Sequence, residues 1–214
     1  MEDNPKQYNV YMTAFGAFGN ITNNPTMEIV QDIDLTHLQN VDGKCIKLID
    51  KWIVDVDIDS ANAALDKIHD VMDEHADNHT QNLILHLGVN AGATRIELER
   101  QAVNCTDFGI PDMQGNQPRN EMIDKGEEVC HAYKCKVDID TVCQKLKDCE
   151  HTCGDSEDAG KYLWNYIYYC SMKEFDDFPN FHVIFIHVPE FKTIDKEKQI
   201  ACVSDFIKQW ALTH

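Results

Sequence analysis

The chain has 214 residues, of which 37 are acidic and 19 basic, so its formal net charge at pH 7 is -18. An acidic surface of this kind repels phosphate backbones and anionic lipid, which argues against nucleic acid or a membrane as partner, whereas it suits solubility and could attract a basic partner. Apolar residues make up 43% of the chain, as in ordinary globular proteins. The composition predicts one ordered domain over residues 1–214.

Predicted strands and helices alternate in the first half of the chain. A glycine-bearing turn, Ala14 to Asn20, separates the first strand from a helix that begins near Pro25, because proline suits the first helical position. Ser60 is a good N-cap for a helix whose apolar residues recur at helical spacing. The other predicted elements of this half are a strand over Tyr8–Thr13 and one or two strands within Lys44–Val56.

The second half contains two short apolar runs that end where buried central strands would end. These runs are Asn82–Val89 and Phe181–Val188. Turn-forming residues make Gln101–Gly126 a predicted loop region. Helical patterns cover Asp138–Cys149, Ala159–Met172 and Ile194–Leu212.

This alternation predicts an α/β fold: a three-layer α/β/α sandwich with a mostly parallel central sheet. Functional sites in such sheets gather at the carboxyl ends of the strands. The conspicuous loops follow Thr13, Val89 and Val188, so we expect them to converge at one edge of the sheet.

The nine cysteines favour free thiols over disulfides or a metal site. The polar start of the chain lacks the apolar segment of a secretion signal, so we expect a cytoplasmic protein with reduced cysteines. Five of them fall close together, at Cys130, Cys135, Cys143, Cys149 and Cys153, but without the paired CxxC spacing of structural zinc sites. No cofactor or metal is expected.

Five segments carry candidate chemistry, although each alone is ordinary: His187, for example, lies in an apolar strand, where most histidines are structural. The segments are TAFGAFG (Thr13–Gly19, followed by Asn24-Pro25), HLGVNAGATRIELERQAVN (His86–Asn104), PDMQGNQP (Pro111–Pro118), SEDAGKYLWNYIYYCSM (Ser156–Met172) and FIHVPE (Phe185–Glu190). In this order and spacing they resemble the pyroglutamyl peptidase I family. Two family glycine-loop positions differ, since Ala14 and Ala17 replace a glycine and a proline.

The resemblance implies a three-layer α/β sandwich and a cysteine peptidase that removes N-terminal pyroglutamate from peptides. Its Glu–Cys–His triad maps onto Glu99, Trp164 and His187, and the aromatic residues that hold the pyroglutamyl ring map onto Phe15 and Phe18. In such a triad a thiolate attacks the carbonyl, the imidazole moves the proton, and the carboxylate orients the imidazole. Here a tryptophan occupies the nucleophile position, and an indole cannot attack a carbonyl.

Three hypotheses follow. The sequence favours a pseudoenzyme with a structural or protein-binding role, whose unidentified protein partner could belong to a large assembly. The second hypothesis is a working peptidase that acts on peptides with N-terminal pyroglutamate. It requires a relocated nucleophile, for which Cys105, Cys153 and Cys170 are the candidates, or a sequence in which Trp164 is an error or an engineered change. The third is a protein that binds a pyroglutamyl N-terminus without cutting it.

Overall fold

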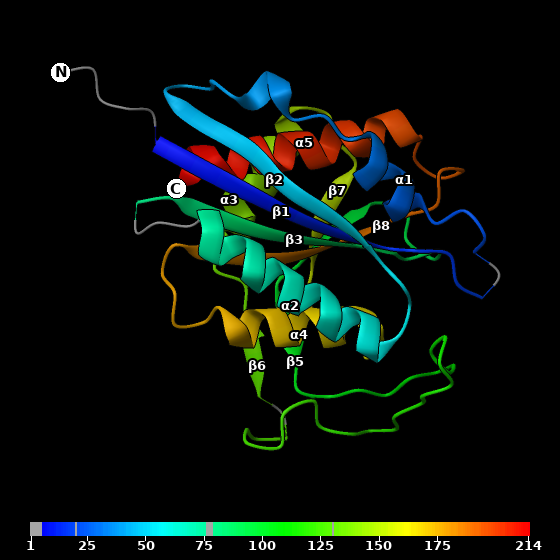
Figure 1. Cartoon of the computed structure of the whole chain (residues 1–214). Helices are drawn as coiled ribbons and strands as arrows, with labels where there is room; N and C mark the ends of the chain where they lie inside the picture. The colour runs from blue at the N-terminus through cyan, green and yellow to red at the C-terminus, as the bar shows by residue number, and fades with distance from the viewer. Residues whose placement is uncertain (1–5, 20, 76–78, 130) are drawn as a thin grey trace.

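The computed structural model describes residues 6–19, 21–75, 79–129 and 131–214. Asn20 at the end of the predicted first turn and Cys130 of the predicted cysteine group therefore lie outside the described residues. Figure 1 shows a twisted central sheet with helices on both faces, which is the predicted three-layer sandwich. No helix of the described ranges is long and apolar enough to cross a membrane.

The central sheet has six strands in the order β2-β1-β3-β8-β4-β7. All neighbouring pairs are parallel except β4 and β8, which are antiparallel. The strands are β1 (Lys6–Phe15), β2 (Lys44–Val54), β3 (Gln81–Val89), β4 (Ile96–Glu99), β7 (Cys153–Ser156) and β8 (Phe181–Val188). A separate two-stranded ribbon pairs β5 (Gln101–Val103) with β6 (Ala132–Lys134). The carboxyl ends of β1, β3 and β8 therefore meet at one edge, as the sequence predicted.

Two hydrophobic clusters cover the two faces of the sheet, because successive strand residues point to opposite sides. Val10 and Met12 of β1 point into the first cluster, and Tyr11 and Phe15 point into the second. The first cluster packs beneath α1 (Pro25–Asp32), α3 (Ile139–Asp148) and α5 (Lys196–Thr213). The second packs beneath α2 (Ile58–His75) and α4 (Leu163–Glu174), which lie together below the sheet in Figure 1.

The two helices that follow β1 and β2 begin at side-chain caps. Asn24 caps α1 by accepting a hydrogen bond from the backbone N–H of Thr26 at 3.0 Å, and Pro25 occupies the first turn as predicted. The prediction of Ser60 as the N-cap of α2 is wrong. This helix begins at Ile58, and Asp57 caps it by accepting from the N–H of Ser60 at 2.8 Å.

Several predicted boundaries are corrected by the structure. Of the one or two strands expected within Lys44–Val56, the structure has one, β2, which ends at Val54 and has an irregular register opposite Val10 and Tyr11. The predicted loop region that starts at Gln101 opens with strand β5, and β4, β6 and β7 were not predicted at all. These strands have only three or four residues, too few to show an alternating pattern. The helix predicted from Ala159 begins at Leu163, after a turn that contains Gly160 at φ +76°.

The eight described cysteines are all free. Cys143, Cys153 and Cys202 are buried in the cluster beneath α1, α3 and α5. Within the described part of the chain, no group of three or more histidine, cysteine or acidic side chains is arranged to hold a metal ion.

Candidate functional site

The candidate site lies at the carboxyl ends of β1 and β8, on the face of the sheet that α2 and α4 cover. Phe15 is the last residue of β1, and His187 is next to last in β8. Glu99 ends β4, the strand antiparallel to β8, and Trp164 lies in the first turn of α4. Elements far apart in sequence thus bring all the predicted site residues to one edge.

His187 and Glu99 form a buried hydrogen-bonded pair. Nδ1 of His187 lies 2.7 Å from Oε1 of Glu99, and the two side chains are 5% and 1% exposed. A carboxylate oxygen accepts hydrogen bonds, so Nδ1 is the nitrogen that donates to Glu99, and Nε2 is the ring nitrogen that does not face the carboxylate. This is the orientation that an imidazole needs to take a proton from a neighbouring group.

The Glu99 backbone is fixed from two sides. Its carbonyl accepts a hydrogen bond from the hydroxyl of Tyr168 on α4 at 2.9 Å. The next residue, Arg100, donates to the Asp155 carboxylate at 2.7 Å and also pairs with Asp140 on α3. The second carboxylate oxygen of Glu99, Oε2, is buried and has no hydrogen-bond partner among the described residues.

Gly88 of β3 makes room for the side chains beside His187. A methyl group on Gly88 would lie 2.5 Å from Cζ of Phe185 and 3.4 Å from Cδ2 of His187. The Phe185 ring therefore occupies the space above Gly88 and packs against the imidazole, with ring centroids 4.8 Å apart. Phe185 also stacks with His86 of β3, at a centroid distance of 6.4 Å.

Trp164 is enclosed by aromatic rings. Its indole lies edge-on to Phe15, Phe18 and Tyr162, with ring centroids 4.4, 5.5 and 5.6 Å away. Tyr162 in turn packs against Phe108, at 4.6 Å. Trp164 is only 8% exposed. We call Phe15, Phe18, Tyr162 and Trp164 the aromatic cluster; within it the indole is in contact with both rings that the resemblance assigns to the pyroglutamyl group.

The start of helix α1 holds the strand end that carries Phe15. The Thr26 hydroxyl donates to the Phe15 carbonyl at 3.3 Å, and the Asn24 side-chain amide donates to the carbonyl of Gly16 at 2.9 Å. Both polar side chains are fully buried. Ala14 lies within β1 and is not among the residues with positive φ, so the absence of a glycine there causes no strain.

The three cysteines considered as relocated nucleophiles occupy different places. Cys153 belongs to the cluster on the other face of the sheet from His187. Cys170 is part of α4 but contacts Tyr166, and burial raises the pKa of its thiol to about 11. Cys105 lies in the loop after β5, where its carbonyl accepts a hydrogen bond from Asn165 at 2.9 Å.

The loop from Thr106 to Glu121 borders the aromatic cluster and is tightly hydrogen-bonded. Asp112 is the centre of this loop: its carboxylate accepts from the N–H groups of Gln114, Asn116 and Ile58. Burial acts to raise the pKa of the Asp112 carboxyl, but hydrogen bonds from Asn116, Ile58 and Gln114 bring it below its ordinary value. The loop is therefore fastened to the start of α2 by an ionised carboxylate.

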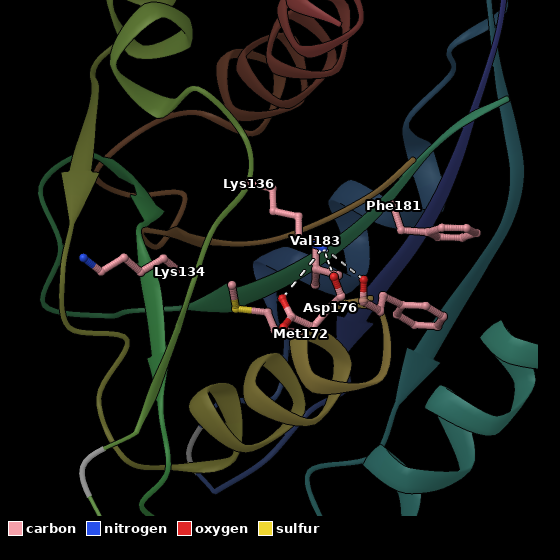
Figure 2. Close-up of a pocket in the computed structure, with 7 residues that line it drawn as sticks. Lys134, Lys136, Met172, Asp176, Phe181 and Val183 are labelled. Atoms are coloured by element: carbon pink, nitrogen blue, oxygen red, sulfur yellow. Dashed lines mark hydrogen bonds and ion pairs between the residues drawn. The ribbon is translucent and has the colours of Figure 1, made fainter. Parts of the chain in front are cut away.

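A small hollow lies at the end of the sheet opposite the candidate site, between α4 and the start of β8 (Figure 2). The ammonium of Lys136 donates there to the backbone carbonyls of Phe175, Asp176 and Phe178, which follow the end of α4. The free space is about 10 Å³, room for about one water molecule. Lys136 thus holds the turn that follows α4, and the hollow beside it is too small for a ligand.

Comparison with known proteins identifies the family. The sequence profile of the family described as pyroglutamyl peptidase matches residues 8–207. The chain belongs to the pyroglutamyl peptidase family. The pyrrolidone-carboxylate peptidase of Vibrio parahaemolyticus is 30% identical over 181 residues, which are 84% of this chain and 77% of that protein.

Solved structures of pyroglutamyl peptidases share the fold along almost the whole chain. The pyrrolidone carboxyl peptidase of the hyperthermophile Pyrococcus furiosus superposes with a TM-score of 0.78 at 27% identity, covering 96% of this chain and 98% of that one. Pyroglutamyl peptidase I of Bacillus amyloliquefaciens gives a TM-score of 0.77 at 24% identity, covering 96% and 97%. The α/β sandwich predicted from the sequence is thus the fold of this family.

Sequence reasoning missed three residues that shape the site. Tyr162 and Phe108 extend the aromatic cluster, and Gly88 admits Phe185 beside His187. Tyr162 could have been suspected because it stands two residues before Trp164. Phe108 and Gly88 gave no such signal, since their contacts depend on how distant segments pack.

Proposed function

We propose that this member of the pyroglutamyl peptidase family does not hydrolyse peptides and acts instead as a structural or protein-binding subunit. The observation that carries the proposal is the indole of Trp164, which occupies the position assigned to the nucleophile and packs 4.4 Å from the centroid of Phe15. Tryptophan offers only a weakly acidic N–H donor, so it supplies no attacking atom. Removal of a nucleophile alone costs several orders of magnitude in rate.

The retained pair Glu99–His187 has the geometry of a general base, but it has no thiol to activate in this proposal. A buried, mutually hydrogen-bonded acid and imidazole also tie β4 to β8, which gives both residues a structural use. Two of the three alternative cysteines do not favour a working peptidase. Cys153 is on the far face of the sheet, and the Cys170 thiol is held protonated by burial.

The packing of Trp164 also argues against the third hypothesis, a protein that binds pyroglutamyl N-termini without cutting them. Phe15 and Phe18 already contact the indole, so their ring surfaces are not free to hold a pyrrolidone ring. We therefore propose that the partner binds outside the position that the resemblance assigns to the pyroglutamyl ring. In the same proposal the protein works in the cytoplasm with a protein partner. Nucleic acid and membranes are not proposed as partners, because a net charge of -18 repels their anionic surfaces.

The test is hydrolysis of a fluorogenic pyroglutamyl amide by the purified protein. We expect no turnover above buffer for the wild type and for Trp164→Ala, which opens the pocket without adding a nucleophile. Trp164→Cys should gain measurable turnover if His187 and Glu99 remain in register, and a further His187→Ala change should abolish that gain. Wild-type turnover that a thiol-alkylating reagent blocks would overturn the proposal.

A further inference from the structure

A ridge of exposed apolar side chains lies beside the aromatic cluster. Ile110 and Met113, on the loop after β5, are 53% and 58% exposed. We call these two residues the ridge. Each of these two side chains, three residues apart on the same loop, leaves more than half of its surface in water, where an apolar partner could cover it.

The backbone of the loop that carries the ridge is held by hydrogen bonds at three positions. The Met113 N–H donates to the carbonyl of Val56 at 2.9 Å, and the hydroxyl of Tyr162 donates to the carbonyl of Pro111 at 3.3 Å. The Phe108 N–H donates to the Pro118 carbonyl at 2.9 Å, which closes the base of the loop. The exposed side chains are therefore presented on a preorganised scaffold, which lowers the entropy cost of binding a partner.

A cleft of about 500 Å³ adjoins the ridge, between the start of α2 and residues 114–121. Its polar lining consists of two carboxylates and three amides, with no lysine or arginine: Asp59, Gln114, Asn116, Gln117 and Glu121. The nearest arginine in sequence, Arg119, pairs with Asp107 at 3.7 Å. The cleft therefore offers negative charge and hydrogen-bond acceptors to an entering group.

We propose that the ridge and the cleft together form a docking surface for a partner protein, whose binding segment carries a lysine or arginine flanked by apolar residues. The apolar residues would cover Ile110 and Met113, and the cation would enter the cleft between Asp59 and Glu121. The charge of the cleft selects for a cation, and the ridge distinguishes such a segment from a purely polar polycation. This assignment rests on the protein-binding half of the proposed function and names its surface.

Charge also argues against a symmetric contact between two copies of this chain through this surface. Asp59 and Glu121 of one copy would then face the same carboxylates of the other and repel them. A cationic segment of a different protein gains attraction from the same field, which speeds its association.

The experiment selects binders from a display library of random peptides on the immobilised wild-type protein at physiological ionic strength. Enriched peptides are then synthesised with a fluorescent label, and their Kd is measured by anisotropy. We expect enriched sequences to carry a lysine or arginine next to apolar residues. The double variant Ile110→Ser/Met113→Ser should weaken their binding by about tenfold or more. Asp59→Asn/Glu121→Gln should weaken it by several-fold.

Phe178→Ser is the matched control, because Phe178 is a similarly exposed apolar residue, 49% exposed, near the far hollow of Figure 2. It should leave the Kd within about twofold. The inference is overturned if no peptide is enriched above the uncoated support, if the enriched peptides lack cations, or if the double variant binds them as the wild type does. It is also overturned if the wild type sediments as a dimer that the double variant dissociates. The hydrolysis assay is independent of all these results.

Discussion

His86 stays uncharged within the sheet. It is fully buried on β3, its Nδ1 lies 2.7 Å from the hydroxyl oxygen of Thr13, and burial lowers the pKa of its imidazole to about 3. In the unfolded chain the pKa of the His86 imidazole is near 6.5. Below that pH the unfolded chain therefore binds a proton at His86 that the folded chain does not bind. The stability that the neutral His86 contributes is therefore complete above pH 6.5, and it is lost progressively as the pH falls toward 3.

We predict that His86→Gln flattens this pH dependence. Each such imidazole contributes a slope of about 1.4 kcal/mol per pH unit below pH 6.5, and the variant should lose that slope. Urea unfolding at several pH values between 5 and 7 checks it. His182, whose pKa burial and nearby cations also lower to about 3, should keep its own share in the variant. An unchanged slope in His86→Gln would show that His86 can be protonated in the folded protein.

Gly88 provides a second prediction at the scale of single residues. A methyl group there would overlap the Phe185 ring and touch His187, so Gly88→Ala should cost about 1–3 kcal/mol of unfolding free energy. Gly92→Ala is the control, since its nearest neighbour would be a side-chain oxygen of Asn90 at 3.5 Å. Chemical denaturation of both variants compares them, and equal stability would mean that Phe185 moves aside freely.

At the scale of elements, the cap of α2 is where sequence and structure disagree most clearly. Asp57 accepts from the N–H and hydroxyl of Ser60 and from the amide of Gln114, so it ties the helix start to the loop that carries the ridge. We predict that Asp57→Ala costs about 1–2 kcal/mol, whereas Ser60→Ala stays within about 0.5 kcal/mol. Thermal unfolding followed by circular dichroism measures both. A larger loss in Ser60→Ala would restore the cap predicted from the sequence.

The long elements were predictable because their patterns are long. The apolar runs of β3 and β8 and the helical stripe of α2 each repeat often enough to identify the element. Strands β4 and β7 have four residues each, and their existence depends on pairing with each other and with β8. Glu99 ends one of these short strands, so its identity came from the resemblance rather than from any local pattern.

At the scale of the whole molecule, the excess of acidic residues opposes folding through self-repulsion. Salt screens this repulsion over about 8–10 Å at physiological ionic strength. We predict that Tm rises by about 2–4 °C between very low and physiological salt, the shift expected from about 1 kcal/mol in a chain of this size. Differential scanning fluorimetry in sodium chloride and in tetramethylammonium chloride should give the same rise. A falling Tm would mean that attractive ion pairs outweigh the repulsion.

The resemblance assigned five residues to the candidate site, and their role there stays a prediction: Glu99, His187, Trp164, Phe15 and Phe18. In the structure Glu99 pairs with His187, and Trp164 packs against both phenylalanines. In the structure the indole lies against both phenylalanines, with Tyr162 on a third side. These contacts depend on the angle at which α4 meets the end of β1. Such an angle is set by tertiary packing, which a single sequence does not encode locally.

The enclosure of Trp164 limits which substitutions at position 164 the fold can tolerate. A side chain that is 8% exposed and surrounded by three rings contributes to the stability of the fold, and replacing it with a small residue leaves a cavity. A mutation that placed a thiol at position 164 would thus arrive together with a weaker fold, and it would need compensating changes elsewhere in the chain. Under the proposed function, the side chain that leaves the site without a nucleophile is also one that stabilises the fold, so its replacement carries a cost in stability.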